Sequence, residues 1–169
     1  FSVWDTDSVV ILNAIWSLEW ATVELDYGYN KKTSTKYVNS VNPVYTFENP
    51  KRNGFTCTGW KTADGVLHPV GSEVEVPMTG LKATAQWKEK EYKIIYKDSR
   101  DGHIIKTLYQ KASDDLLTED DVPKFAGKRF AGWLFDTVGG QTTSITDAKV
   151  SYVIDLALEK DEYILTTYY

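Results

Sequence analysis

The chain has 169 residues and a net charge of −5 at neutral pH; 42% of its residues are hydrophobic and 25% are charged. This composition is typical of globular proteins and excludes wholesale disorder, and the length suits one ordinary domain or two small ones. The acidic balance argues against nucleic acid as a partner, and no apolar run approaches the roughly 20 residues of a membrane-spanning helix, so we expect no membrane insertion in this segment.

Residues 1–20 have the pattern expected at the end of a preceding repeat unit. The chain begins at Phe1 without a Met, a basic region or the hydrophobic stretch of a signal peptide, which predicts a piece of a longer or processed chain. An alternating run that ends in Trp16 is echoed further along the chain by Leu81–Trp87. We therefore interpret residues 1–20 as the C-terminal remnant of a preceding repeat. We expect its strand to pack on the residues that follow or to pair with the edge of another molecule.

Residues 21–88, the first unit, predict a mostly β structure. Thr22–Tyr27 alternates polar and apolar residues, which indicates a half-buried strand, and a weaker strand is expected around Thr35–Val38. The Gly-containing run Gly54–Trp60 predicts a third strand. An alternating strand that ends in Trp87 completes the unit.

Residues 89–169, the second unit, repeat this order. Lys93–Lys97 and His103–Gln110 predict a hairpin, with Asp98–Gly102 as its turn. Ser113–Asp121 predicts one or two helical turns with Ser113 as N-cap, whereas the corresponding part of the first unit predicts less helix. The second unit is longer than the first between its Gly-Trp pair and its last aromatic residue, and we expect this expansion near residues 138–160.

The repeat itself predicts a set of core residues. Gly54–Trp60 recurs in the second unit as Gly127–Trp133. Residues in repeat register share a structural task, so we expect the following to form the repeat core: Trp16, Phe55, Cys57, Trp60, Trp87, Phe130 and Trp133. Trp4 and Trp20 lie outside the main register and are candidates for an interaction surface, because an exposed ring at a joint is costly unless something covers it.

These motifs resemble the Listeria–Bacteroides repeat, the B-repeat of internalin-type surface proteins. The resemblance rests on the string Gly-aromatic-Thr-x-x-Gly-Trp at Gly54–Trp60, on a proline ahead of it, and on the closing strand that ends in Trp. Cys57 departs from the usual aromatic residue, and Tyr169 replaces a closing Trp. The resemblance implies an α+β, mostly β fold of tandem β-grasp-like units, each a mixed sheet with a short helix or turn. It brings no catalytic residues.

Few residues could carry reaction chemistry. His68 and His103 fall at non-equivalent positions of the two units, and a shared catalytic or zinc site would need them close together. Cys57, the only cysteine, could act as a nucleophile activated by His68, but its register with Phe130 favours a place in the core. We expect no enzyme activity, no cofactor and no metal.

Two groups of acidic residues could in principle bind calcium. One group combines oxygen ligands that suit Ca²⁺ but lacks the spacing and central glycine of an EF-hand, so a solvated helix face is favoured; its members are Asp114, Asp115, Glu119, Asp120 and Asp121. Asp98 and Asp101 lie in the predicted hairpin turn, where side-chain caps of the backbone explain them.

The leading hypothesis is a non-enzymatic repeat region of an exported bacterial cell-surface protein, extracellular or in the cell envelope. It would act as a spacer or stalk and as an adhesion or protein-interaction module, and the short link Lys88–Glu91 favours a semi-rigid rod. The expected partners are neighbouring repeats or domains of the same chain and a host or cell-envelope protein or glycan. The alternative is a glycan- or peptide-binding module that uses exposed aromatic residues or a sheet edge. A small hydrolase is a third interpretation that the residue inventory hardly supports.

Overall fold

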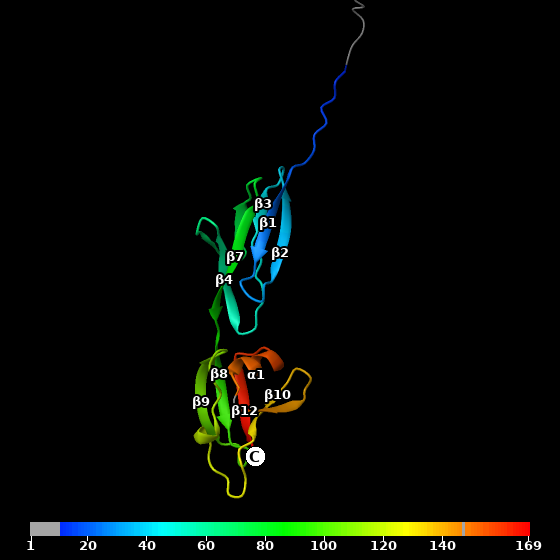
Figure 1. Ribbon diagram of the computed structural model, residues 1–169. Helices are drawn as coiled ribbons and strands as arrows, with labels where there is room; N and C mark the ends of the chain where they lie inside the picture. Colours follow the sequence, from blue (N-terminus) through cyan, green and yellow to red (C-terminus); the bar gives the residue numbers. More distant parts are fainter. Residues whose placement is uncertain (1–10, 147) are drawn as a thin grey trace, which may run out of the picture.

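The computed structural model describes residues 11–146 and 148–169, so Trp4 lies outside the described residues. Two five-stranded sheets follow one another along the chain, and a two-stranded ribbon accompanies the first of them (Figure 1). One short α-helix accompanies the second sheet. The class predicted from the sequence, α+β and mostly β, is confirmed.

The first sheet is mixed, and its strands lie in the order β2-β1-β7-β4-β5. Strands β1 and β7, which come first and last along the chain in this sheet, are parallel neighbours, and the other pairs are antiparallel. The strands are β1 (Trp20–Asp26), β2 (Thr33–Asn39), β4 (Phe55–Thr62), β5 (Leu67–His68) and β7 (Leu81–Glu89). The ribbon pairs β3 (Val44–Thr46) with β6 (Glu73–Glu75).

The second sheet has the order β9-β8-β12-β10-β11, which is the same arrangement. Here too the first and last strands, β8 and β12, are parallel neighbours, and the other pairs are antiparallel. The strands are β8 (Glu91–Lys97), β9 (Ile104–Lys111), β10 (Gly132–Asp136), β11 (Thr142–Ile145) and β12 (Glu162–Tyr168). The predicted hairpin over residues 93–110 is therefore confirmed, with Gly102 at φ +76° in its turn.

Each sheet contains a glycine that the neighbouring backbone requires. Gly59 in β4 and Gly132 in β10 have φ of +149° and +133°, a region that side chains rarely adopt. A Cβ at Gly59 would lie 2.5 Å from the His68 carbonyl oxygen, and one at Gly132 would lie 2.2 Å from that of Ile145. The Gly-Trp motif is therefore set by the close approach of the next strand.

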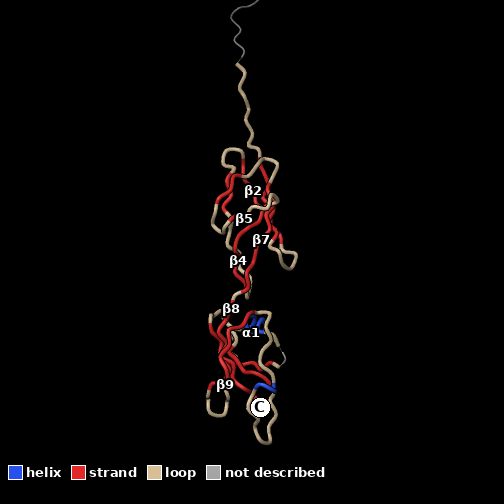
Figure 2. The backbone as a smooth tube through the Cα atoms, turned by 90° about the vertical axis from the view of Figure 1, so that its left-hand side faces the viewer, coloured by secondary structure: helices blue, strands red, loops and turns tan. Residues whose placement is uncertain are grey.

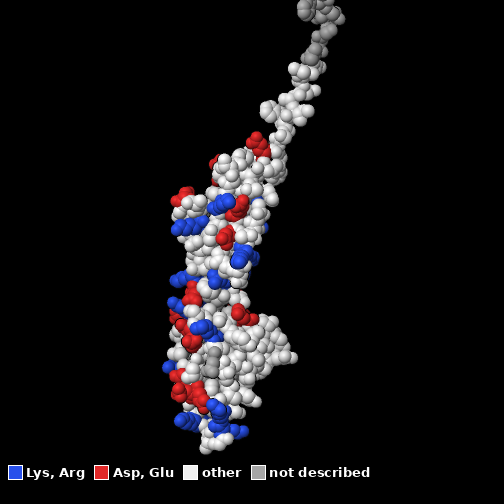
Figure 3. Space-filling model, in the orientation of Figure 1, with Lys and Arg blue, Asp and Glu red and all other residues white. Residues whose placement is uncertain are grey.

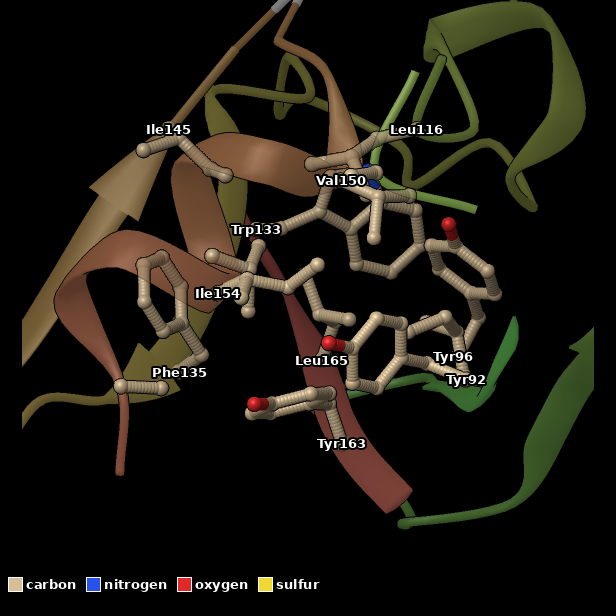
Figure 4. Close-up of a cluster of buried hydrophobic side chains, with 14 of the residues drawn as sticks. Tyr92, Tyr96, Leu116, Trp133, Phe135, Ile145, Val150, Ile154, Tyr163 and Leu165 are labelled. Carbon is tan, nitrogen blue, oxygen red and sulfur yellow. The ribbon is translucent and has the colours of Figure 1, made fainter. Parts of the chain in front are cut away.

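Each sheet covers a core of its own, and the two sets of buried residues share no member. A tryptophan lies at the centre of each core: Trp60 is 0% exposed and Trp133 is 1% exposed. The indole N–H of Trp60 donates to the Glu48 carbonyl at 2.8 Å, and that of Trp133 donates to the Leu117 carbonyl at 2.7 Å. Figure 4 shows Trp133 between the sheet residues and the helix that covers the second core.

The helix lies elsewhere than predicted. Over Ser113–Asp121 only Glu119–Asp121 is helical, as a single 3-10 turn, and its N-cap is Thr118 instead of Ser113. The α-helix α1 (Val150–Leu156) falls in the expanded region. Its buried residues Val150, Val153 and Ile154 follow helical spacing and face the core, whereas the acidic 113–121 segment has few apolar side chains to bury.

The segment ahead of β1 also corrects an expectation. Residues 11–19 form no strand, and Figure 2 shows this stretch as loop. Their side chains are exposed; Trp16 is 90% exposed, so its assignment to the repeat core is wrong. The expected packing of this segment on the first unit is likewise not found for residues 11–18. Glu19, next to β1, does contact the first unit: the Ser40 backbone N–H donates to the Glu19 carbonyl at 2.9 Å. Strand β7, which these residues resemble in sequence, lies between β1 and β4. In the described part of the chain, residues 11–19 have no such neighbouring strands, so their apolar side chains have no sheet to pack in.

Candidate functional site

The junction between the two sheets is short and closely packed. Strand β7 ends at Glu89 and β8 begins at Glu91, so Lys90 alone separates them. The Lys90 backbone N–H donates to the Gly54 carbonyl at 2.9 Å. The chain therefore passes from one sheet to the next with no flexible linker (Figure 1).

The Gly54 backbone lies close to the Ala112 side chain at this junction. Gly54 is buried, has φ +80°, and a Cβ placed on it would lie 2.8 Å from the Ala112 side chain of the second unit. The site therefore needs a glycine at residue 54 and a small side chain at residue 112. Such steric matching limits rotation of one unit against the other.

Polar contacts surround this close approach. The Asn53 side-chain amide donates to Asp155 at 3.3 Å, and the Ser113 hydroxyl donates to Glu89 at 3.3 Å. The Lys90 ammonium donates to Glu159 at 2.6 Å. Exposed pairs of this kind contribute at most about 1 kcal/mol each, so we assign them a role in orientation more than in stability.

The two sides of the junction carry opposite charge. Lys51 and Arg52 lie on the first unit, while Asp155 and Glu159 lie on the second. The pKa of Glu159 is held below its ordinary value by the hydrogen bond from Lys90, with the charge of Lys51 adding to the effect. Figure 3 shows basic and acidic side chains close together at this level of the molecule.

An aromatic cluster around a guanidinium supports the first unit's side of the junction. The Arg52 guanidinium carbon lies 3.8 Å from the Phe55 ring centre, 4.8 Å from that of Tyr29 and 5.7 Å from that of Trp87. Tyr29 meets Trp87 edge to face at 5.6 Å, and the Trp87 indole N–H donates to the Tyr27 carbonyl at 2.7 Å. Cation–π contacts of this kind hold a long side chain in one place.

A second cluster of this kind closes the far end of the second unit. The Arg100 guanidinium carbon lies 5.2 Å from the Phe125 ring centre and 6.0 Å from that of Tyr169, and these two rings meet edge to face at 5.3 Å. The Tyr169 hydroxyl donates to the Pro123 carbonyl at 2.9 Å. Arg100 also pairs with the buried Asp98, and this pairing lowers the pKa of Asp98 to about 2.

The residues predicted for the repeat core occupy several environments. Trp60, Trp133 and Cys57 are buried, Phe130 is partly buried against the second core, and Phe55 and Trp87 are partly buried beside Arg52. Burial raises the pKa of the Cys57 thiol, which disfavours the nucleophilic thiolate.

Trp20, one of the two candidate interaction residues, begins β1 and is 60% exposed. It lies at the opposite end of the first sheet from the junction with the second unit, so it does not take part in that contact.

The candidate catalytic residues are held by other contacts. His68 hydrogen bonds with the Thr62 hydroxyl at 3.2 Å, and the exposed His103 contacts Asp101 at 2.6 Å. Among the described residues, no hydrogen bond joins Cys57 to either histidine. Ligand atoms of Asp98, Asp101 and His103 lie within 4.8 Å of one another. Asp98 and Asp101 nevertheless accept backbone N–H groups within the turn, which confirms their predicted role as caps.

Sequence reasoning missed a pair of exposed tyrosines. Tyr37 lies opposite Thr22, and Tyr109 lies opposite Lys93, at the same place in each hairpin. The two side chains are 64% and 68% exposed, on the sheet faces that point away from the cores. The signal that could have found them is their equivalent place in two alternating strands. Repeat register alone does not distinguish a shared core position from a shared surface position.

Another surface feature is a hollow of about 570 Å³ on the outer face of the first sheet. Most of the residues that line it have polar side chains, and two of them, Lys82 and Glu24, form an ion pair at 2.8 Å. Among the described residues, none of those that line it is aromatic. The hollow therefore lacks the stacking surface that a sugar site would need.

Two sheets of one topology, each with its own tryptophan-centred core and joined end to end, define a modular β-rich protein. Residues 92–157, within the second unit, match the family model of the Listeria-Bacteroides repeat domain, so the resemblance is confirmed for this part of the chain. Repeats of this family occur in surface proteins and are generally non-catalytic. No curated protein matches the chain. The described residues include no helix of the length and apolar character that crossing a bilayer demands.

Proposed function

We propose that this chain is a non-enzymatic, semi-rigid spacer in an exported cell-surface protein, and that it holds neighbouring repeats or domains in line. The observation that carries the proposal is the junction, where Lys90 alone links β7 to β8 and where Gly54 meets Ala112. A spacer needs such a joint because free rotation between units would shorten the mean reach of the array.

The strand order supports a role under tension. In each unit the first strand and the last strand are parallel neighbours, so the chain enters at one end of the sheet and leaves at the other. Four residue pairs join β1 to β7 and five join β8 to β12. Tension along the chain would shear these hydrogen bonds together instead of opening them one at a time.

Rotational diffusion measured by ¹⁵N NMR relaxation on the whole chain tests the proposal. We expect amides of both sheets to report one anisotropic tumbling tensor, because the junction couples the two units. Separate correlation times for residues 20–89 and 91–168 would contradict a spacer of fixed shape.

We place the protein outside the cell or in the cell envelope, with a host or envelope protein or glycan as further partner and with no nucleic acid and no membrane insertion. The support is the occurrence of this repeat family in surface proteins. Antibody labelling of intact cells of the source organism, with permeabilised cells as control, tests the location. Labelling only after permeabilisation would contradict it.

A second candidate function is adhesion through the outer sheet faces. The observation that favours it is the pair Tyr37 and Tyr109, exposed at equivalent positions. Exposed aromatic rings suit glycans and peptides because one flat face offers contact area at low entropy cost. Binding to a glycan array should be lost in the double variant Tyr37→Ser/Tyr109→Ser and retained in Tyr152→Ser, whose side chain is also exposed. Equal binding by both variants would remove this candidate.

A further inference from the structure

The clusters at the two unit ends are built from equivalent positions. Strands β1 and β8 start at Trp20 and Glu91, and this register places Tyr29 and Arg100 at the same point of the two hairpin turns. Counting from the Gly-Trp pairs, Arg52 corresponds to Phe125.

The closing strands agree with this correspondence. Gly59 pairs with Gln86, and Gly132 pairs with Tyr168. The next residues along each strand, Trp87 and Tyr169, are therefore equivalent, and both contact the guanidinium of their cluster.

The second unit exchanges the two partners of the cation–π contact. In the first unit Tyr29 supplies the ring and Arg52 the cation, at 4.8 Å. In the second unit Arg100 supplies the cation from the turn position, and Phe125 supplies the ring, at 5.2 Å. The contact is thus kept although both residues differ, which indicates that the arrangement has a task at each unit end.

In the first unit the cluster lies beside the contact with the next unit. A groove there is lined by Tyr29, Arg52 and Phe55 from the first unit and by Ala112 and Asp155 from the second. The cluster therefore supports the loop that presents Gly54 to Ala112.

The second unit has an equivalent of this contact surface, and none of the described residues packs against its glycine. Gly127 corresponds to Gly54 and has a similar φ, +73° against +80°. Gly54 is buried, whereas Gly127 is exposed and has no atom within 4 Å of a Cβ placed on it.

Charge and shape indicate what would fit this surface. Lys124 corresponds to Lys51, whose charge helps to lower the pKa of Glu159 and which lines the same groove as Asp155. Lys124, Lys128, Phe125 and Tyr169 line a hollow of about 380 Å³, together with Glu119 and Asp120 at the 3-10 turn. The complementary surface in this molecule is the one that already sits on the first unit, with a small residue at 112 and an acid at 155.

We propose that Arg100, Lys124, Phe125, Gly127 and Tyr169 form an end platform that binds a further unit of the second unit's kind. This inference rests on the proposed spacer function and names the partner of the second unit at the end away from the junction. The occupant would present a small residue like Ala112 to Gly127 and a helix acid like Asp155 to Lys124.

The first unit of another copy is a poorer occupant. Its position equivalent to Ala112 is Ser40, because Asn39 and Lys111 occupy equivalent places opposite Trp20 and Glu91. Its described residues contain no α-helix to supply an acid like Asp155. We therefore expect the chain not to assemble head to tail through its first unit.

The test is an extended chain in which Tyr169 is followed directly by a second copy of residues 88–169. Tyr169 then takes the place of Trp87 ahead of the same link. We expect ¹⁵N relaxation and small-angle X-ray scattering to report a three-unit rod in which the appended unit shares the common tumbling. A third unit that tumbles freely while the first two still tumble together would overturn the end platform and leave the spacer function standing.

Variants in the extended chain separate docking from folding. Asp155→Lys in the appended copy changes only an exposed helix side chain and should release the third unit, whereas Lys106→Ala in the natural second unit should leave it docked. Phe125→Ala in the natural second unit should also release the third unit, and the amide spectrum of residues 91–168 checks that this unit remains folded. A third unit that stays docked in both release variants would overturn the assignment.

Discussion

At the residue scale, each Gly-Trp pair meets two requirements of its sheet: close approach of the neighbouring strand and a filled core. The glycine lets a neighbouring carbonyl approach to a distance that no side chain would allow, and the tryptophan that follows it fills the space beneath the sheet. Tyr27 packs edge to face against Trp60 at 5.4 Å, and Tyr96 packs against Trp133 at 4.7 Å. The ring and its hydrogen-bonded N–H together make this side chain hard to replace.

Removing either tryptophan should unfold its own unit only. Trp60→Ala or Trp133→Ala deletes a fully buried ring and leaves a backbone carbonyl without its donor, so we expect a loss of about 3–5 kcal/mol in the free energy of unfolding of that unit. Urea unfolding followed by amide NMR resolves the two units. Trp16→Ala is the control, since its ring is exposed and its loss should change stability by less than about 0.5 kcal/mol. A single cooperative loss of both units would contradict independent cores.

The buried Asp98 predicts a pH dependence of the second unit. Hydrogen bonds from Arg100, through its side chain and its backbone N–H, hold the pKa of Asp98 at about 2, below the value of about 3.9 in an unfolded chain. Between these two pKa values Asp98 is protonated in the unfolded chain and ionised in the folded unit. The free energy of unfolding of the second unit therefore falls as the pH falls from about 4 to about 2. Stability of the second unit, measured across this range, should decline more steeply in the natural chain than in Asp98→Asn. The same pH dependence of stability in the natural chain and in Asp98→Asn would contradict this role of Asp98.

At the element scale, the sheets agree in their strand order but differ in what covers them. The first core is closed beside the β3–β6 ribbon by Phe47 and Val76, and the second is closed by α1. Strand pairing is set by backbone hydrogen bonds and by the Gly-Trp register, and both units meet those requirements. The covering element has only to fill the remaining space, so a ribbon and a helix both serve.

The β10–β11 contact should tolerate no side chain at residue 132. Gly132→Ala places a Cβ against the Ile145 carbonyl and puts alanine at φ +133°, so we expect at least about 2 kcal/mol of destabilisation. Gly139→Ala is the matched control, because its Cβ would meet nothing within 4 Å. Thermal unfolding monitored on second-unit amides measures both. Similar midpoints for the two variants would show that the strand approach is not limiting.

At the scale of the whole molecule, the junction decides whether two small cores behave as one rod. At the junction Gly54 packs against Ala112, and exposed polar pairs lie around this contact. Because polar pairs contribute little individually, we expect the steric match to dominate the coupling.

Gly54→Ala should loosen this coupling, since its Cβ would lie 2.8 Å from the Ala112 side chain. Gly127→Ala supplies the control: it imposes nearly the same strain at φ +73° with nothing nearby to displace. We expect Gly54→Ala to separate the correlation times of the two units in ¹⁵N relaxation and Gly127→Ala to leave them equal. Equal tumbling in both variants would contradict the steric joint.

The sequence alone determined the parts of this protein that depend on local pattern. Alternation predicted the principal strands, the turn residues predicted the hairpin, and the recurring Gly-Trp pair predicted equivalent buried tryptophans, because strand period and backbone freedom are properties of a few adjacent residues. Only the tertiary structure decided the position of α1, the exposure of Trp16 and the exchange of Tyr29 and Arg52 for Arg100 and Phe125. These depend on which surfaces remain uncovered once the sheets have formed, and residues distant in the sequence supply that cover.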